Sequence, residues 1–286
     1  MTAASVFDPR ICELGEGALW HPQRRQLFWF DILGRRLLSQ TEDAPLEWQF
    51  DEMVSAAGWI DQDHLLIASE TALLRFDLRN GSHKPLVALE PDRPGNRSND
   101  GRADPQGGFW IGTMSRKAEP GQGAIYRYLD GDLRRLHGNL SIPNAICFSA
   151  DGRLAYFADT AVQTVWAQDL DAQGWPVGQP RVYLDLAGSD QFPDGAVTDD
   201  QGRFWNARWG SGTVACHAPD GQLLHRLDVP ARQPSCPCFA GDDLSRLIVT
   251  SAAEGLSAGE RSAGDGQTWR LDPGPARGRP EPRVRA

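Results

Sequence analysis

The sequence lacks the features of several protein classes. It has no run of about eighteen apolar residues, which excludes a transmembrane helix. Its first residues, "MTAASVFDPRICELGEG", contain no basic stretch followed by an apolar core, so we expect no secretory signal. The formal net charge of −9 argues against a nucleic-acid surface, because phosphate binding depends on clustered Lys and Arg. We therefore expect a protein that binds neither membrane nor nucleic acid.

Cysteine is scarce and odd in number. The five cysteines are Cys12, Cys147, Cys216, Cys236 and Cys238. Their scattered positions favour free thiols in a reducing compartment over a disulfide framework, so we expect a cytoplasmic protein. Cys236 and Cys238 lack the second Cys or His pair that would complete a tetrahedral metal site. We interpret them as buried thiols near a strand.

Long runs of helix-forming residues are absent, whereas residues typical of turns and strands are abundant. The 286 residues include 30 glycines, 20 prolines and 10 tryptophans, a composition typical of many short strands joined by tight turns. The length is near the upper limit for one hydrophobic core. Composition therefore favours one large all-β domain, and two separate β-sandwiches are the alternative.

A unit made of a polar turn and a short apolar strand recurs along the chain. The six copies are "HPQRRQLFWFDI" (21–32), "DQDHLLIASE" (61–70), "DPQGGFWIGT" (104–113), "SADGRLAYFADT" (149–160), "DDQGRFWNARW" (199–209) and "GDDLSRLIVTSA" (241–252). Their central apolar residues are Trp29, Ile67, Trp110, Tyr156, Trp205 and Ile248. A period of about forty to fifty residues is typical of β-propeller blades. The repeat predicts a single six-bladed β-propeller over residues 1–286 and disfavours two sandwiches.

The ring of blades must close, because an open edge would leave backbone groups unpaired. We expect "QTWRLD" (267–272) to be the last strand and the N-terminal "SVFDPRI" to be its partner. The Pro- and Arg-rich tail, residues 273–286, is either a closing edge strand or a partly disordered end, and we expect the second.

Oxygen-bearing side chains recur at one position in four of the six units. Glu16, Asn99, Asn144 and Asp194 each lie eleven to thirteen residues before the central apolar residue of their unit. The inner strands of a propeller line its central channel, so we expect these side chains to converge there. Two carboxylates and two amides would form a pocket for a divalent cation. The matching positions of the second and sixth units, 55–57 and 236–238, would supply small walls.

Each of these residues also has a simpler explanation. Glu16 could be a solvated turn acid, and Asn99 could belong to an ordinary Asn-Asp-Gly turn. Asn144 and Asp194 each follow a proline and could bond to their own backbone. Four such residues at one offset favour a shared site.

The stretch "FPDGAVTDDQGRFW" (192–205) contains acids of two kinds. Asp194 lies between Pro193, which restricts the backbone, and Gly195, which frees it. Asp199 opens a hairpin turn before an apolar strand. We expect Asp194 to face the channel, and we expect the exchange of Asp199 for Asn to have little effect on function.

Five stretches resemble a known family in their order and spacing. They are "LGEGALWHP", "RSNDGRADPQGGFWIGTM", "SIPNAICFSADGRLAYFADT", "FPDGAVTDDQGRFWNARWGSG" and "CFAGDDLSRLIVTSA". From Leu14 to Asp272 the chain resembles the senescence-marker-protein/gluconolactonase/regucalcin family. The resemblance implies a six-bladed propeller with one divalent metal in the channel. It also implies hydrolysis of a sugar lactone, such as gluconolactone or a pentonolactone, to the aldonic acid.

The resemblance also implies roles for individual residues. The family's metal ligands fall on Glu16, Asn144 and Asp194, its catalytic base on Asp194, and its substrate contacts on Arg97 and Asn99. An acidic substrate contact that follows Gly-Thr-Met in the animal members is replaced here by Lys117, which makes a different lactone a candidate. The metal could be Ca²⁺, Zn²⁺, Mn²⁺, Mg²⁺ or Fe²⁺, because oxygen ligands admit all of them.

Other functions stay open at this stage. The same scaffold could hold calcium without turnover, or hydrolyse phosphotriesters or other esters; a WD-type interaction propeller lacks its Trp-Asp and Gly-His signatures. Arg97 and Asn99 favour an enzyme, because a pure ion site needs no hydrogen-bond donors at its mouth.

We interpret His21 as a turn residue, and Asp159 as a strand-end cap or pocket wall just outside the site. We expect a monomer or weak dimer.

Overall fold

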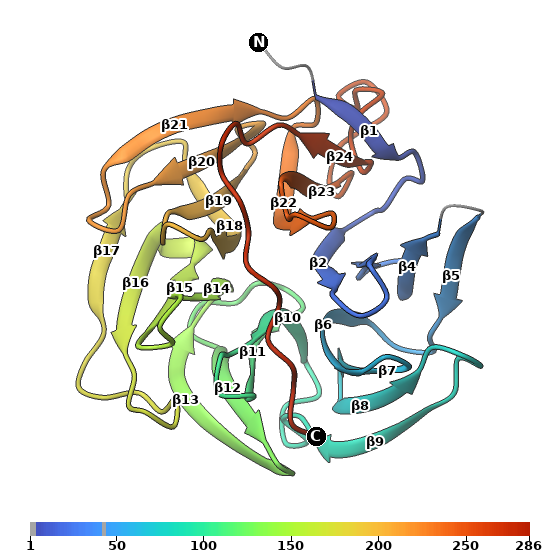
Figure 1. The fold of residues 1–286 in the computed structure, drawn as a ribbon, viewed down its shortest axis with the longest axis vertical. Coiled ribbons are helices and arrows are strands. Elements are labelled where there is room, and N and C mark those ends of the chain that lie inside the picture. The colour runs from blue at the N-terminus through green and yellow to red at the C-terminus, as the bar shows by residue number, and fades with distance from the viewer. Residues whose placement is uncertain (1–3, 42–43) are drawn as a thin grey trace.

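The recurring units of the sequence form the second strands of six four-stranded sheets arranged around a central channel (Figure 1). The structure is a computed structural model and describes residues 4–41 and 44–286. Neighbouring strands within each sheet are antiparallel, as expected where short turns join consecutive strands. The predicted six-bladed β-propeller is confirmed.

Each blade contains four strands from the axis to the rim. The inner strands are β2 (Gly15–His21), β6 (Val54–Asp61), β10 (Asn96–Ala103), β14 (Pro143–Phe148), β18 (Phe192–Thr198) and β22 (Gln233–Ala240). The second strands are β3 (Gln26–Asp31), β7 (His64–Ser69), β11 (Phe109–Ser115), β15 (Leu154–Asp159), β19 (Phe204–Trp209) and β23 (Arg246–Ala252). The third strands are β4 (Arg36–Gln40), β8 (Ala72–Asp77), β12 (Gly123–Leu129), β16 (Thr164–Asp169), β20 (Thr213–His217) and β24 (Thr268–Leu271). The outer strands are β5 (Pro45–Gln49), β9 (His83–Ala88), β13 (Asp132–Leu140), β17 (Arg181–Asp185), β21 (Leu223–Asp228) and β1 (Ser5–Asp8).

Burial changes from the axis to the rim and explains the sequence patterns. Inner strands such as β14 and β22 are buried at every position, because a neighbouring blade packs against each face of their sheet and their inner edge faces the channel. The outer strand β5 instead alternates between exposed and partly buried residues. The core lies between the blades, where the repeat residues Trp29, Trp110 and Trp205 are fully buried.

Blade 6 closes the ring by joining the two ends of the chain. Its strands run in the order β22, β23, β24, β1, and β1 pairs antiparallel with β24 through Ser5 and Arg270 and through Val6 and Trp269. The predicted partnership of the N-terminal strand with residues 267–272 is confirmed. Among the described residues, none forms a helix with the length and hydropathy of a membrane span. A single 3₁₀ turn, η1 (Thr160–Val162), follows β15.

The C-terminal segment 273–286, which we call the C-terminal strap, forms neither a sheet strand nor a free end. It runs in extended form across one face of the propeller, over the channel (Figure 1). The strap bonds to blades 2 to 6: Val284 N–H donates to Trp59 O (2.9 Å), Arg285 N–H to Gly107 O (2.8 Å), Arg279 to Phe148 O (2.7 Å) and to Thr198 Oγ1 (2.6 Å), and Gly278 N–H to Leu244 O (2.8 Å). These contacts correct the expectation of a partly disordered end.

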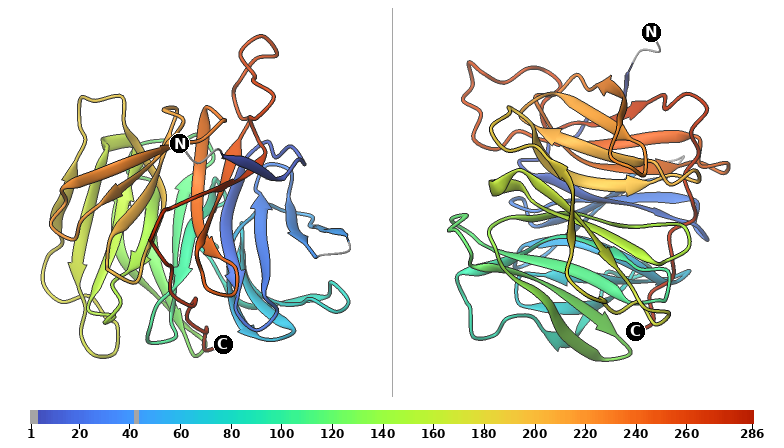
Figure 2. Two further views of the ribbon diagram at one scale, coloured as in Figure 1. Left: turned by 45° about the horizontal axis from the view of Figure 1, so that its top comes forward. Right: turned by 90° about the vertical axis from the view of Figure 1, so that its left-hand side faces the viewer.

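A buried ion pair anchors the strap at the channel. Glu281 of the strap pairs with Arg102 at the end of β10, and both side chains are less than a tenth exposed. The Glu281 carbonyl also accepts a hydrogen bond from Trp59 Nε1 (2.8 Å). The strap contacts Phe148 and Thr198, the last residues of their inner strands. It therefore closes one end of the channel, and the loop 253–267 stands on the opposite face (Figure 2, right).

Candidate active site

Every inner strand departs from regular pairing at the same level of the channel. The breaks in register lie between Glu16 and Leu19, Val54 and Ala56, Ser98 and Gly101, Asn144 and Cys147, Pro193 and Ala196, and Pro234 and Pro237. A β-bulge re-aims side chains next to it. The common offset seen in the sequence is therefore the place where each blade bulges into the channel, at the end opposite the strap.

Two of these bulges contain a residue in the left-handed region. Gly17 follows Glu16 with φ of 58°, and Ala145 follows Asn144 with φ of 57°. A Cβ on Gly17 would overlap the carbonyl oxygen of Ser55 in the next blade. Glycine is therefore required beside Glu16, whereas blade 4 accommodates alanine in the same backbone conformation.

A cavity of about 540 Å³ opens at this end of the channel. Among the residues lining it are five that we predicted from the sequence: Glu16, Arg97, Asn99, Asn144 and Asp194. Lys117 is exposed and does not line it; its neighbours Arg116 and Ala118 do. Arg116 forms an ion pair with Glu70. The structure thus brings the predicted ligands and two of the predicted substrate contacts together, and separates Lys117 from them.

Glu16 and Asp194 are buried acids that share the cavity. Burial raises the pKa of Asp194 well above its usual range, and the charges of Glu16 and Asp100 raise it further. Burial likewise raises the pKa of Glu16, with a further contribution from Asp100. Neither acid has an Arg, Lys or His partner within 4.0 Å in the described part of the chain. The cavity therefore concentrates negative charge that a bound cation would neutralise.

The two amides beside these acids are held by defined partners. Asn144 Nδ2 donates to Thr160 Oγ1 (2.7 Å), and Asn144 Oδ1 accepts from Asn99 Nδ2 (3.0 Å). Asn99 Nδ2 also donates to Pro143 O (3.0 Å), and Asn99 Oδ1 accepts from Arg97 (2.7 Å). Both N–H groups of Asn99 are thus engaged, and Asn144 retains an oxygen lone pair.

Arg97 is a cationic residue that lines the same cavity as Glu16 and Asp194, and its charge acts on both acids. One of its terminal nitrogens donates to Ser98 O (2.9 Å) and to Asn99 Oδ1 (2.7 Å). Its other two nitrogens have no hydrogen-bond partner among residues 4–41 and 44–286. Burial lowers its pKa, while the charges of Glu254, Glu16 and Asp194 raise it. Arg97 therefore offers free donors to a ligand in the cavity.

These oxygens suit a divalent cation. Two carboxylates and one amide oxygen are hard donors, as Ca²⁺, Mg²⁺ or Mn²⁺ prefer. No group of three His, Cys, Asp or Glu side chains able to hold a metal occurs in the described ranges, which agrees with a set that includes an amide. The burial of two carboxyl groups in one cavity, without an Arg, Lys or His within 4.0 Å of either among the described residues, is the observation that favours a cation. The donor set fits the metal implied by the resemblance.

No motif in the sequence predicted the residues that line the outer part of the cavity. This lining lies at or just after the end of the second strand in five blades: Leu33, Arg116, Ala118, Thr160, Ala161, Trp209 and Glu254. Their shared position at the end of that strand becomes recognisable only once the blades are aligned. Half-buried Glu254 has a raised pKa because of burial. Asp100, in the bulge of β10, was also missed; its buried carboxylate accepts from Ile146 N–H (2.7 Å).

Several predictions about neighbouring residues can now be checked. The walls expected from residues 55–57 and 236–238 do not line the cavity; Ser55 and Cys236 are buried in the bulges of β6 and β22. Asp159 caps η1 by accepting from Ala161 N–H (3.1 Å) and does not line the cavity. His21 is buried at the far end of β2, where its Nε2 lies 3.0 Å from Asp61 O. The five cysteines are buried free thiols.

Asp199 is more than a solvated turn acid. It is fully buried; its Oδ1 accepts from Gln201 N–H (3.0 Å) and Arg203 N–H (2.9 Å), and its Oδ2 accepts from Trp205 Nε1 (2.9 Å). Arg203 Nε also donates to Oδ2 (2.5 Å). Exchange of Asp199 should therefore lower stability, although it lies outside the cavity lining.

The stretch Gly255–Gly259 has the G-x-S-x-G spacing of a hydrolase nucleophile elbow, a match that the sequence inspection missed. A nucleophile elbow joins a strand to a helix, and no helix follows here. Ser257 is exposed, and its Oγ donates to Glu260 (2.6 Å). The geometry does not support Ser257 as a nucleophile.

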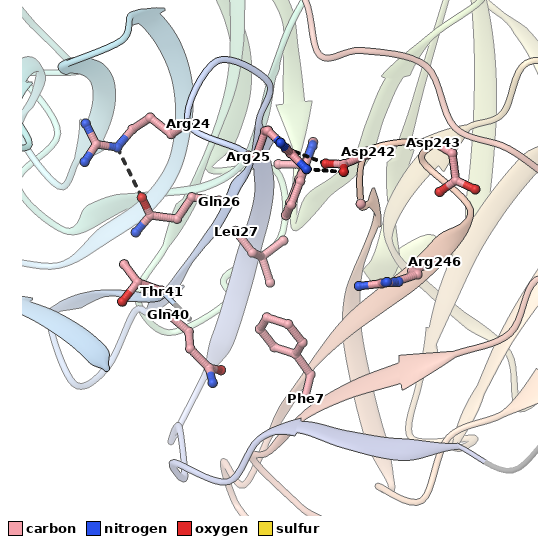
Figure 3. A pocket seen from close by; sticks show the side chains of 12 residues that line it. Phe7, Arg24, Arg25, Gln26, Leu27, Gln40, Thr41, Asp242, Asp243 and Arg246 are labelled. Carbon is pink, nitrogen blue, oxygen red and sulfur yellow. Dashed lines mark hydrogen bonds and ion pairs between the residues drawn. The ribbon is translucent and has the colours of Figure 1, made fainter. Parts of the chain in front are cut away.

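A larger cavity, of about 730 Å³, lies between blades 1 and 6 and includes neither Glu16 nor Asp194 in its lining (Figure 3). Two of its charged side chains have partners within the lining: Arg25 pairs with Asp242, and Arg24 Nε donates to Gln26 (3.1 Å). Phe7 and Leu27 supply apolar surface. Volume alone would favour this cavity, but the unpaired buried acids favour the smaller one in the channel.

Comparisons with known proteins identify the family of the chain. Residues 14–253 match the SMP-30/gluconolactonase/LRE-like region. The crystal structure of a calcium-binding protein, regucalcin, from Agrobacterium tumefaciens strain C58 is 41% identical, covers 100% of this chain and 98% of its own, and has a TM-score of 0.96. The L-arabinolactonase of Azospirillum brasilense is 39% identical over 85% of this chain and 82% of its own. The pentonolactonase of Haloferax volcanii is 33% identical over 98% of this chain and 97% of its own.

Proposed function

The chain belongs to the SMP-30/gluconolactonase/LRE-like family, and from this premise we propose that it hydrolyses a sugar lactone to the aldonic acid with the help of one divalent cation. Glu16, Asn144 and Asp194 would hold the cation. The observation that carries the proposal is the pair of buried acids, Glu16 and Asp194, which share one cavity and have no cationic partner within 4.0 Å among the described residues. Similarity to proteins named L-arabinolactonase and pentonolactonase supports the substrate class.

The residues of the cavity have separate roles in the proposed hydrolysis. When bound, a divalent cation supplies Lewis-acid polarisation of the carbonyl and stabilises its developing negative charge. Asp194 accepts the proton of the attacking water on its carboxylate. Arg97 donates from its two free nitrogens to the ring hydroxyls or the carbonyl oxygen.

Asn99 takes a different part from the one that the resemblance suggests. Both of its N–H groups are engaged by Pro143 O and Asn144 Oδ1. In this arrangement it orients Asn144 and Arg97, and a substrate contact through its N–H groups would have to replace one of these bonds. We therefore propose Arg97 as the main hydrogen-bond donor to the substrate. Arg116, at the rim, takes the place in the lining that we expected for Lys117.

The cavity suits a small ligand with both apolar and polar faces. Trp209 and Phe192 contribute partly exposed aromatic surface beside the charged floor. A few polar groups set in an apolar lining are typical of small-molecule sites. The cavity lies at the end of the channel opposite the strap, so we propose that substrate enters from the loop side.

A panel of aldonolactones tests the proposal. Hydrolysis releases an acid, so a pH indicator can follow pentonolactones and hexonolactones with and without a chelator. We expect hydrolysis of at least one lactone and its loss in chelator. Hydrolysis of phosphotriesters or simple esters with no activity on any lactone would contradict the proposed substrate class.

Calcium binding without turnover is the second candidate. The solved relative from Agrobacterium tumefaciens is named a calcium-binding protein, and the donor set fits Ca²⁺. Arg97 argues against a pure ion site, because its free donors point to recognition of a ligand. Tight Ca²⁺ binding together with no activity on the lactone panel would favour this candidate.

A further inference from the structure

A chain of hydrogen bonds crosses three blades beneath the cavity. Its four steps are Arg97 to Asn99 Oδ1 (2.7 Å), Asn99 Nδ2 to Asn144 Oδ1 (3.0 Å), Asn144 Nδ2 to Thr160 Oγ1 (2.7 Å) and Thr160 Oγ1 to Pro193 O (2.7 Å). All five residues are buried. The chain links the substrate donor, one proposed cation ligand and the residue that precedes another.

The two ends of this chain fix its direction. Arg97 can only donate, and the backbone carbonyl of Pro193 can only accept. Thr160 has a single hydroxyl proton, which it gives to Pro193 O; toward Asn144 it can therefore only accept. On the other side, Asn99 offers Asn144 an N–H group. Asn144 must consequently turn Nδ2 to Thr160 and Oδ1 to Asn99.

This direction matters because an amide has two unlike ends. The terminal torsion of an Asn side chain is broad and roughly two-fold, so the torsion alone does not choose between them. Rotation by half a turn would replace the oxygen by an NH₂ group, which repels a cation. With Nδ2 held by Thr160, Oδ1 keeps a lone pair for a ligand.

Thr160 also acts on the backbone beside Asp194. Its hydroxyl holds the carbonyl of Pro193, the residue directly before Asp194 in the bulge of β18. The Thr160 backbone N–H donates to Ile142 O (3.0 Å), and Thr160 begins η1 after the cap Asp159. The hydroxyl is thus fixed in place between two proposed ligands on neighbouring blades.

We propose that Thr160 is a positioning residue: its hydroxyl fixes the Asn144 amide with the oxygen available to the cation and steadies the backbone that presents Asp194. The inference rests on the proposed function, since it concerns the same site. Nothing in the sequence pattern pointed to Thr160, which lies in the loop after the second strand of blade 4.

The test compares three variants of the full-length protein with Mn²⁺ as the probe. Thr160→Val keeps the shape and removes the hydroxyl, whereas Thr160→Ser keeps the hydroxyl. Thr164→Val is the matched control: it removes a hydroxyl that bonds only to Val162 O (3.1 Å), four residues along the chain. Calorimetric titration and the electron paramagnetic resonance of free Mn²⁺ measure affinity without any assay of turnover.

We expect Thr160→Val to weaken Mn²⁺ binding about 10–100-fold, the usual effect of removing a group that orients a metal ligand. Thr160→Ser and Thr164→Val should bind as the unmodified protein does. In lactone assays, saturating Mn²⁺ should restore most of kcat in Thr160→Val and leave KM for the lactone unchanged. Should Thr160→Val fold poorly, Thr160→Ala leaves room for a water in place of the hydroxyl and should show a smaller loss of affinity.

Two results would overturn the inference in different ways. Equal Mn²⁺ affinity in the unmodified protein and in folded Thr160→Val or Thr160→Ala would contradict the positioning role alone. No Mn²⁺ binding by the unmodified protein would contradict the proposed cation site itself, and the positioning role with it.

Discussion

The buried ionisable groups at the two ends of the channel differ in their partners. At the strap end, the buried charges of Arg102 and Glu281 form an ion pair within the chain. At the loop end, Glu16 and Asp194 are equally buried, but no cation of the described chain lies within 4.0 Å of them. Burying a charge is costly unless it is paired. The strap end is therefore complete as a structure, whereas the loop end is complete only with a ligand.

This contrast separates structural acids from functional ones. Asp199 and Glu281 are buried and have donors or a cation on the chain, as expected for groups that hold the fold together. Asp194 is buried, and no Arg, Lys or His lies within 4.0 Å of it among the described residues. The partners of a carboxylate, rather than its burial, indicate which of the two roles it has.

Loss of the functional acid should have the largest effect on activity. Asp194→Asn removes a cation ligand and the proton acceptor, so we expect kcat for lactone hydrolysis to fall about 10²–10⁴-fold. Thermal unfolding should change little or rise in the metal-free protein, because a buried charge is removed. Asp199→Asn in the same blade is the control: it should lower the melting temperature and leave kcat of the folded protein unchanged. The reverse pattern would show that the wrong acid was chosen.

Loss of the structural acid should have the largest effect on stability. Glu281→Ala leaves Arg102 buried without its partner, which typically costs about 3–5 kcal/mol of unfolding free energy. Urea denaturation measures this cost. The double variant Arg102→Met/Glu281→Leu removes both charges and should recover most of the stability. If Glu281→Ala unfolds at the same urea concentration as the unmodified protein, the strap does not stabilise the ring as we describe.

A change of pH should affect the loop end in particular. Burial and the charge of Asp100 raise the pKa of Glu16 from 4.5 to about 8, so across this window the folded, metal-free protein holds more protons than the unfolded chain. Its unfolding free energy should therefore fall as pH rises through the window. A cation must displace these protons, so Mn²⁺ affinity should rise by up to about tenfold per pH unit for each proton released. Calorimetric titration across the window measures both effects, and pH-independent affinity would contradict the assignment.

Gly17→Ala should have the smallest of these effects. The new Cβ would overlap Ser55 O, and a left-handed conformation would be imposed on alanine, so we expect a loss of about 1–3 kcal/mol in unfolding free energy. Because Gly17 follows Glu16, Mn²⁺ affinity should fall as well. Gly131→Ala is the matched control, since Gly131 also has a positive φ but no atom within 4 Å of the new Cβ. It should cost stability without changing Mn²⁺ affinity.

The parts of the molecule that repeat were predictable from the sequence. Trp29, Trp110 and Trp205 recur because each blade buries one large residue against its neighbour, and this period predicted the propeller. The offset that selected Glu16 and Asp194 also repeats, because each inner strand bulges at one level.

The parts that occur once were not predictable. The strap has no counterpart in other blades, and its Pro- and Arg-rich composition resembles that of a disordered tail. Thr160, Trp209 and Glu254 lie at or just after the ends of second strands whose following loops differ in length and composition, so only the folded ring shows that they share the cavity. Lys117 was misplaced for the same reason, since the loop after β11 turns Arg116 and Ala118 into the lining.

Titration of metal-stripped protein with Mn²⁺ during lactone hydrolysis tests the central claim most directly. We predict no hydrolysis above the uncatalysed rate in chelator. Activity should then return as Mn²⁺ is added and saturate at one cation per chain, with no return in Glu16→Gln. Full hydrolysis by the metal-stripped protein would contradict the claim that the unpaired acids at the loop end of the channel bind a cation required for the reaction.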